Sequence, residues 1–193
     1  MKYRYDIVVA GWIGLKGSLD RITACEKEFA DRYPNHYIGK IKSGCEKLIA
    51  SKKIEEAIAN YNYLVIGENN LYSEKDKSDI HTIIYTIEKG GLYRALWDMS
   101  IVLNKGFEIN RYSIPILQET VEVCDFFNEN LYEVDGTGAY LIYSEDAVGI
   151  IKQLELAGIS AGLIGYATKE LAKQIVRDDD IQYLDKPRKR LME

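Results

Sequence analysis

The chain has 193 residues, 47% of them apolar and 28% charged, which suits one globular domain. Its formal net charge of −5 argues against broad binding to nucleic acid or to anionic membranes. No apolar run approaches the roughly 20 residues of a membrane helix, and Met1 to Asp6 lead into a strand pattern rather than a signal peptide. We therefore expect a cytoplasmic protein that binds neither nucleic acid nor membranes.

The first part of the chain predicts a strand, three helices and a second strand. They cover residues 5–10, 19–33, 38–49, 54–61 and 64–66. Gly11 ends the first strand, Ser18 is a suitable N-cap for the first helix, and Pro34 stops that helix. Residues 67–79 are polar and charged, which predicts an exposed insertion.

The second part of the chain predicts a regular alternation of strands and helices. Strands are expected at 80–87, 107–109, 139–143, 160–166 and 181–184, and helices at 92–103, 116–127, 148–154 and after Thr168. Gly106 would close its helix as the C′ residue and Pro115 would lie in the first turn of the next. Residues 185–193 form a basic tail. Since no linker divides the chain, we predict one α/β domain over residues 1–193.

The cysteines and histidines do not predict a redox or metal site. Cys25, Cys45 and Cys124 are too few and too far apart for a disulfide framework or a zinc ribbon. Cys25 and Cys124 fall on apolar faces of predicted helices, where a buried thiol acts as a small hydrophobic group. His36 and His81 share no ligand spacing with a cysteine or with each other. No metal site is expected.

A first glycine-rich turn follows the first strand. Gly11, Gly14 and Gly17 precede a helix, as a phosphate-binding loop would. Their spacing is G-x-x-G-x-x-G, which matches neither the dinucleotide motif nor the P-loop. Trp12 and Ile13 between them are bulky and apolar, so the turn is better suited to packing than to phosphate binding.

Two further turns leave alternatives open. Gly90 and Gly91 at a helix start either present amides to an anion or form a tight turn that needs positive φ angles. Taken alone, the tight turn is the better interpretation. Residues 135–138 (D-G-T-G) either approach a ligand or form an ordinary turn. With two histidines in the chain, we find no Ser/His/Asp or Cys/His arrangement.

Five blocks carry a resemblance that the single motifs do not. They are, in chain order, D-I-V-V-A-G-W-I-G-L-K-G-S (Asp6–Ser18), E-K-G-G-L-Y-R-A-L-W-D-M (Glu88–Met99), I-P-I-L-Q-E-T-V-E-V-C-D-F-F (Ile114–Phe127), T-G-A-Y-L-I (Thr137–Ile142) and A-G-I-S-A-G-L-I-G-Y-A-T (Ala157–Thr168). Together they resemble the C-terminal domain of aminoimidazole ribonucleotide (AIR) synthase-related proteins, in particular the HypE-like hydrogenase maturation factors. Residues 183–187 (Y-L-D-K-P) add a weaker match.

The resemblance implies a three-layer α/β domain, partly ferredoxin-like, with a mixed sheet flanked by helices. In complete members, a separate N-terminal domain carries most ligands of the ATP phosphates and magnesium, and ATP lies in the cleft between the two domains. We expect that N-terminal domain to be missing here. Members activate an amide or carbonyl oxygen with ATP or phosphorylate a small acceptor, and the HypE-like members dehydrate a carboxamide to a cyano group.

Two departures from the family argue against independent catalysis. Alignment on the Gly-Gly pair places Thr86, Ile87, Glu88 and Lys89 where the family has Asp-Pro-Thr-Glu, so the carboxylate at the first position is lost. The chain also ends Leu-Met-Glu at 191–193, without the acceptor cysteine of the HypE-like enzymes.

The resemblance therefore predicts an accessory or ligand-binding module that completes an ATP site with a separately encoded ATP-binding-domain protein. ATP and Mg²⁺ would bind only with that partner or in a cleft between copies of the chain. Two alternatives stay open: a small ATP-dependent enzyme acting as a homo-oligomer, and a degenerate scaffold for protein association. The candidate ligand-binding residues are Gly90, Gly91, Thr86, Glu88, Thr137 and Gly138.

Overall fold

The computed structural model describes residues 5–50, 53–66 and 81–187. The predicted insertion at 67–79 lies outside the described residues, as does the predicted tail beyond residue 187. Among the helices that are described, none is long and apolar enough to cross a membrane.

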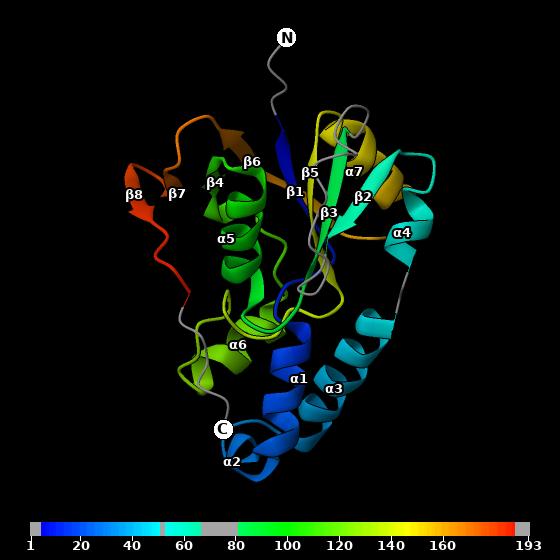
Figure 1. Ribbon diagram of the computed structural model, residues 1–193. Coiled ribbons are helices and arrows are strands. Elements are labelled where there is room, and N and C mark those ends of the chain that lie inside the picture. Colours follow the sequence, from blue (N-terminus) through cyan, green and yellow to red (C-terminus); the bar gives the residue numbers. More distant parts are fainter. Residues whose placement is uncertain (1–4, 51–52, 67–80, 188–193) are drawn as a thin grey trace.

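The centre of the molecule is an eight-stranded mixed sheet with the order β2-β3-β5-β1-β6-β4-β7-β8 (Figure 1). The strands are β1 (Asp6–Ala10), β2 (Tyr63–Ile66), β3 (Thr82–Ile87), β4 (Gly106–Asn110), β5 (Ala139–Ser144), β6 (Ala161–Thr168), β7 (Lys173–Arg177) and β8 (Asp180–Tyr183). β2 and β3 are parallel, as are β4 and β7, and the other neighbours are antiparallel. It follows that β1, β2, β3, β4 and β7 all end at one edge, which we call the carboxyl edge.

Helices cover both faces of the sheet and extend beyond the carboxyl edge (Figure 1). They are α1 (Leu15–Ala24), α2 (Glu26–Ala30), α3 (Asn35–Ala50), α4 (Lys53–Ala57), α5 (Gly91–Leu103), α6 (Gln118–Phe126) and α7 (Ala147–Leu156), with a 3₁₀ turn at Arg111–Ser113. α5 packs on one face, and α7 with α4 packs on the other. The predicted three-layer α/β class is confirmed.

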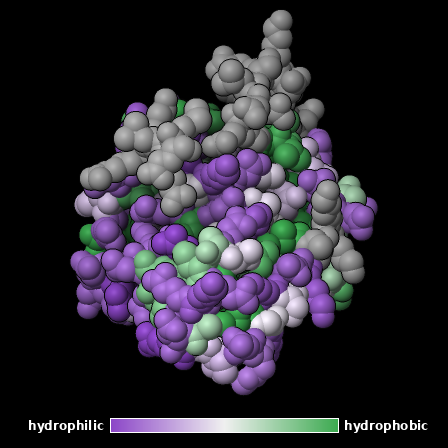
Figure 2. Space-filling view, turned by 90° about the horizontal axis from the view of Figure 1, so that it is seen from below, coloured by the Kyte–Doolittle hydropathy of each residue, from purple (hydrophilic) through white to green (hydrophobic). Residues whose placement is uncertain are grey.

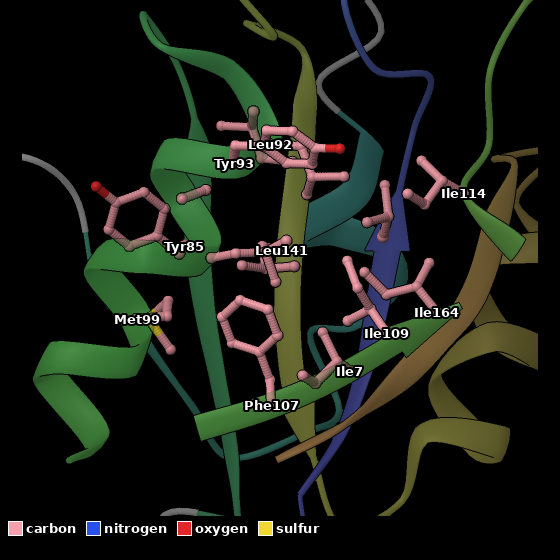
Figure 3. Packing of buried hydrophobic residues seen from close by; sticks show 14 of the residues in the cluster. Ile7, Tyr85, Leu92, Tyr93, Met99, Phe107, Ile109, Ile114, Leu141 and Ile164 are labelled. Atoms are coloured by element: carbon pink, nitrogen blue, oxygen red, sulfur yellow. The ribbon is translucent and has the colours of Figure 1, made fainter. Parts of the chain in front are cut away.

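The central strand β1 is buried on both faces, because its side chains alternate between the two helical layers. Ile7 and Val9 belong to the core under α5, whereas Val8 and Ala10 belong to the core under α7. Figure 3 shows the first core, where side chains of α5 lie over the sheet around Leu141. The continuous apolar run of β1 is the sequence pattern that such a strand requires.

A third core lies beyond the carboxyl edge, among α1, α2, α3 and α6. Phe29 is fully buried there, with its ring centre 4.4 Å from Tyr33, 5.0 Å from Phe126 and 5.9 Å from Phe127. Seen from this end, hydrophilic residues cover most of the visible surface, with hydrophobic residues between them (Figure 2). This helical group holds the turns at the carboxyl edge in place.

The predicted helix at 19–33 is wrong in its start and its continuity. α1 begins at Leu15, because Gly14 adopts a left-handed conformation (φ 72°) and serves as its N-cap. Ser18 is a buried residue inside α1 rather than a cap. Cys25 leaves the helical region (φ −124°, ψ 36°) and separates α1 from α2, so it lies at a junction and not on a continuous apolar face.

Three other boundaries also differ from the prediction. Gly106 is the first residue of β4, and Asn104 takes the left-handed conformation (φ 49°) at the end of α5. A Cβ at Gly106 would lie 2.2 Å from the carbonyl oxygen of Glu170, so close packing explains this glycine. Pro115 precedes α6 instead of lying in its first turn. The helix expected after Thr168 is the strand β7.

Candidate functional site

The fold brings the six predicted ligand-binding residues to one part of the carboxyl edge. Thr86 lies near the end of β3 and pairs with Tyr140 of β5. Glu88, Gly90 and Gly91 lead from β3 into α5, while Thr137 and Gly138 lead into β5. Because β3 and β5 are neighbours, segments about fifty residues apart in the sequence meet here.

The backbone carbonyl of Glu88 joins the two predicted turns. It accepts hydrogen bonds from the amides of Gly91 (3.0 Å) and Gly136 (3.2 Å). The hydroxyl of Thr86 donates to the Glu88 carboxylate, with Oγ1 3.1 Å from Oε1. The grouping of the two motifs is therefore held by the protein's own hydrogen bonds.

The turn at 135–138 is closed by its aspartate. Asp135 Oδ1 accepts from the Thr137 amide (2.9 Å) and from the Thr137 hydroxyl (2.6 Å). Gly138 has φ 102°, a backbone conformation that residues other than glycine rarely adopt. The exposed Thr137 is thus held in one orientation at the edge, with its hydroxyl hydrogen committed to Asp135.

Two amides at the start of α5, where an anion was predicted, already have acceptors. The Gly91 amide donates to Glu88, and the Tyr93 amide donates to the carbonyl of Tyr132 (3.1 Å). Helix starts bind anions through amides that lack intrahelical partners. An anion that bound the Gly91 amide would have to displace its contact with Glu88, and the assignment of Gly90 and Gly91 stays a prediction.

Close backbone packing explains why this turn contains glycine. A Cβ at Gly91 would lie 2.4 Å from the Tyr132 carbonyl and 2.6 Å from that of Val134, and its φ is 66°. Likewise, a Cβ at Gly17 would lie 2.7 Å from the Val134 side chain. The segment 131–136 is packed between glycine turns, so a substitution such as Gly91→Asp would disturb the fold whether or not the turn binds an anion.

Sequence reasoning did not single out the aromatic and basic group beside this turn. The rings of Tyr93 and Tyr132 are stacked with centres 5.0 Å apart and planes at 10°. Arg111 Nε donates to the Tyr132 hydroxyl (3.0 Å). Burial raises the pKa of the Tyr93 phenol to about 12. No sequence motif marks this group, because its residues come from α5, from the turn after β4 and from the segment before β5, which meet only in the tertiary structure.

The polar side chains of the predicted site and its neighbour Asp135 are carboxylates and hydroxyls. They comprise the carboxylates of Glu88 and Asp135 and the hydroxyls of Thr86 and Thr137. Within the described part of the chain, no three His, Cys, Asp or Glu side chains come together as they would around a metal ion. These groups can form hydrogen bonds with a ligand, and each of the two hydroxyls donates to a neighbouring carboxylate.

The buried thiols are structural groups. Burial raises the pKa of both Cys45 and Cys124 to about 11, so these thiols stay protonated and weakly reactive at neutral pH. Cys124 Sγ lies 3.9 Å from the hydroxyl of Ser18, at the contact of α6 with α1. All three cysteines, including the partly exposed Cys25, are free.

Comparison with known proteins shows likeness in structure but not in sequence. No protein-family model matches the chain, and no curated protein matches its sequence. E. coli HypE, a hydrogenase maturation protein, superposes with a TM-score of 0.66 at 13% identity, over 96% of this chain and 50% of that chain. The structure of a HypE–HypF complex matches with a TM-score of 0.60 at 13% identity, over 97% and 54%.

The likeness extends beyond HypE. Thiamine-monophosphate kinase from Stenotrophomonas maltophilia matches with a TM-score of 0.59 at 11% identity, over 92% of this chain and 51% of that chain. The chain thus spans about half the length of the solved structures that it matches. At such identities the comparison shows a shared fold, which agrees with the resemblance to the C-terminal domain of AIR synthase-related proteins.

Proposed function

We propose that the chain is an AIR synthase-related C-terminal domain that acts as a ligand-binding accessory module, related to the hydrogenase maturation factors. It would complete an ATP site together with a separately encoded ATP-binding protein. The observation that carries this proposal is the match of nearly the whole chain, 96%, to 50% of E. coli HypE. The order of the five sequence blocks supports the same relation.

The hydrogen bonds at the carboxyl edge support a divided ATP site. One matching structure is HypE in complex with ATP, with a TM-score of 0.60 over 94% of this chain. In this chain, the amides of Gly91 and Tyr93 donate to carbonyl groups of the chain itself. Two of the amides that could hold a phosphate at this helix start are therefore engaged, and we assign phosphate binding to the partner.

The side chains at the edge fit a supporting role. The Glu88 and Asp135 carboxylates are hard oxygen groups of the kind that Mg²⁺ binds together with substrate phosphates. Thr86 orients the Glu88 carboxylate, and Asp135 orients Thr137. With ATP held by the partner, these groups would hydrogen-bond the far side of the ligand and position an acceptor molecule. HypE and thiamine-monophosphate kinase share the fold, so the fold alone does not select a reaction.

Calorimetry tests the divided site. The purified chain, titrated with ATP and Mg²⁺, is expected to give no saturable heat. The complex purified through this chain from its native cells is expected to contain a second protein and to bind ATP saturably. Thr137→Val in that complex should weaken ATP binding about tenfold, the 1.4 kcal/mol scale of one lost hydrogen bond.

A matched variant makes the result specific. Thr23 is also an exposed threonine, and its hydroxyl donates to the Leu19 carbonyl in α1. Thr23→Val should leave ATP binding within about twofold, because nothing at the edge changes. Tight ATP binding and turnover by the chain alone would overturn the accessory role and favour the homo-oligomeric enzyme. Equal effects of the two variants would remove Thr137 from the site.

A further inference from the structure

Two arginines lie side by side at the carboxyl edge. In the parallel pair of β4 and β7, Asn110 is in register with Val176. The next residues, Arg111 and Arg177, therefore leave neighbouring strands at the same edge. In open α/β sheets, ligands bind outside the carboxyl ends of such strands.

Arg111 is held in place but is not neutralised. Its side chain is partly buried, its Nε donates to the Tyr132 hydroxyl (3.0 Å), and its guanidinium carbon lies 4.8 Å from the centre of that ring. Tyr132 is 5% exposed and cannot move away easily. Among the residues that the structure describes, no carboxylate pairs with Arg111, and its Nη groups have no hydrogen-bond acceptor.

Arg177 is in a different situation, because two acids, Asp178 and Asp180, lie near it. Arg177 Nε donates to the Tyr112 hydroxyl (3.1 Å), and that hydroxyl donates to Asp178 Oδ2 (2.9 Å). The charge of Arg177 is thus partly balanced by Asp178 and by Asp180, its register partner in β8, so Arg111 is the main binding group of the pair. The hydrogen bond to Tyr132 raises the pKa of Arg111, and the nearby charge of Arg177 acts against this rise.

The arrangement leaves a favourable position for an oxyanion. A guanidinium that is partly removed from water without a counter-ion costs free energy. A second cation at the same edge adds repulsion. A bound oxyanion would remove both costs, since the free Nη groups of Arg111 form a planar fork that matches carboxylate and phosphate oxygens.

We propose that Arg111, with Arg177 held beside it by the Tyr112 hydroxyl, forms a binding site for the carboxylate or phosphate-monoester group of a small molecule. Tyr132 positions the guanidinium and is not itself required to touch the ligand. The site goes beyond the proposed function, because it uses none of the residues of the predicted turns and needs no ATP-binding partner. Its failure would leave the divided ATP site untouched.

Nuclear magnetic resonance of the isolated full chain tests the site. The chain is titrated with methyl phosphate, with acetate and with chloride at matched ionic strength. One of the first two should shift the amide signals of residues 110–112 and 177 saturably, with a millimolar dissociation constant. Chloride should produce no saturable shift. The oxyanion that binds more tightly identifies the chemical class of the ligand.

Three variants assign the binding to the arginines. Arg111→Gln should weaken binding at least tenfold, and Arg177→Gln about threefold. Arg32→Gln is the matched control, because Arg32 is an exposed arginine over a tyrosine ring (5.6 Å, Tyr33) and its loss changes the net charge equally. The control should bind with an unchanged dissociation constant.

A milder variant keeps the test valid if Arg111→Gln fails to fold. Tyr112 is 61% exposed, so Tyr112→Phe removes only the hydroxyl between Arg177 and Asp178. We expect it to weaken binding about twofold with an unchanged fold, because Arg177 loses the hydroxyl that holds it but keeps its charge. The proposal is wrong if neither oxyanion produces saturable shifts, if chloride reproduces them, or if Arg32→Gln weakens binding as much as the variants at the site.

Discussion

Two regions at the carboxyl edge differ in whether their hydrogen-bond donors have acceptors within the chain. In the glycine-turn region, around Gly91 and the turn at 135–138, the amides of Gly91, Gly136 and Thr137 donate to acceptors of the chain. In the arginine region, at the ends of β4 and β7, the Arg111 Nη groups have no acceptor among the described residues.

The comparison shows that a segment can resemble a ligand-binding loop in sequence and still have its donors engaged within the protein. The glycine turns attract attention in the sequence because ligand-binding loops are also rich in glycine. In the structure, these glycines allow backbone segments to pack closely, as the 2.4 Å approach of a Gly91 Cβ to the Tyr132 carbonyl shows. The arginine region has no sequence motif, yet its Arg111 Nη groups meet no acceptor in the part of the chain that the structure describes. Each prediction below tests one side of this contrast.

The largest effect is expected for Gly91→Ala. The new Cβ would collide with the carbonyls of Tyr132 and Val134, at a φ of 66°. We expect a loss of about 3 kcal/mol or more in the free energy of unfolding, because overpacking and backbone strain add. Urea denaturation followed by circular dichroism measures it.

The control is a glycine without neighbours. Gly39 is exposed in α3, and a Cβ there would meet nothing within 4 Å. Gly39→Ala should stabilise the protein by about 0.5–1 kcal/mol, since alanine favours the helix. If Gly91→Ala is as well tolerated as this control, the packing explanation of the glycine turn is wrong.

Removal of the Asp135 carboxylate should have a smaller effect. Asp135→Ala takes away the acceptor of both Thr137 hydrogen bonds. We expect a loss of about 1–2 kcal/mol in the free energy of unfolding, from two partly exposed hydrogen bonds. Asp135→Asn, which keeps a carbonyl oxygen, should lose less. Equal losses would mean that the negative charge, and not the acceptor, stabilises the turn.

Tyr93, which lies between the two regions and stacks on Tyr132, should make the stability of the protein depend on pH. Burial holds the pKa of Tyr93 at about 12, whereas in the unfolded chain it is 10.0. Between pH 10 and 12 the Tyr93 phenol ionises in the unfolded chain but stays neutral in the folded one. Its contribution to the free energy of unfolding is therefore complete below pH 10 and declines as pH rises toward 12. Between pH 9 and pH 11, the free energy of unfolding of Tyr93→Phe should fall by about 1 kcal/mol less than that of the native chain. Parallel curves of stability against pH would contradict the burial of this phenol.

The smallest effect on stability is expected in the arginine region. Arg111→Gln gives up the hydrogen bond to Tyr132 but also removes an unpaired, partly buried charge. These effects oppose each other, so the free energy of unfolding should change by about 0.5 kcal/mol or less. A loss above about 2 kcal/mol in urea denaturation would show that Arg111 is mainly a structural residue.

The apolar periodicity predicted most of the fold. The run of β1, the helical spacing of α3 and the alternation from β3 to β6 are local patterns, and the structure confirms the three-layer class. The errors occur where tertiary contacts override local signals. Gly106 was interpreted as a helix end, but the packing of residue 170 on it requires a glycine in a strand. Thr168 is typical of a helix cap, but the segment that follows it forms β7, which pairs in parallel with β4.

The candidate site divides in the same way. The motifs located Glu88, Gly91 and Thr137, and the adjacency of β3 and β5 brought them together. Whether their hydrogen-bonding groups are free could be decided only by the tertiary structure. The partners of those groups, such as the carbonyl of Tyr132, come from distant segments that no local pattern specifies.

The composition and apolar spacing of the chain were sufficient to identify the α/β class and the order of most of its strands and helices, because each element buries a face that its own residues define. The register of β4 against β7, which places Arg111 beside Arg177, arises only when segments far apart in the chain pack together. Local sequence determines which elements form, and the pairing of distant strands determines which side chains meet.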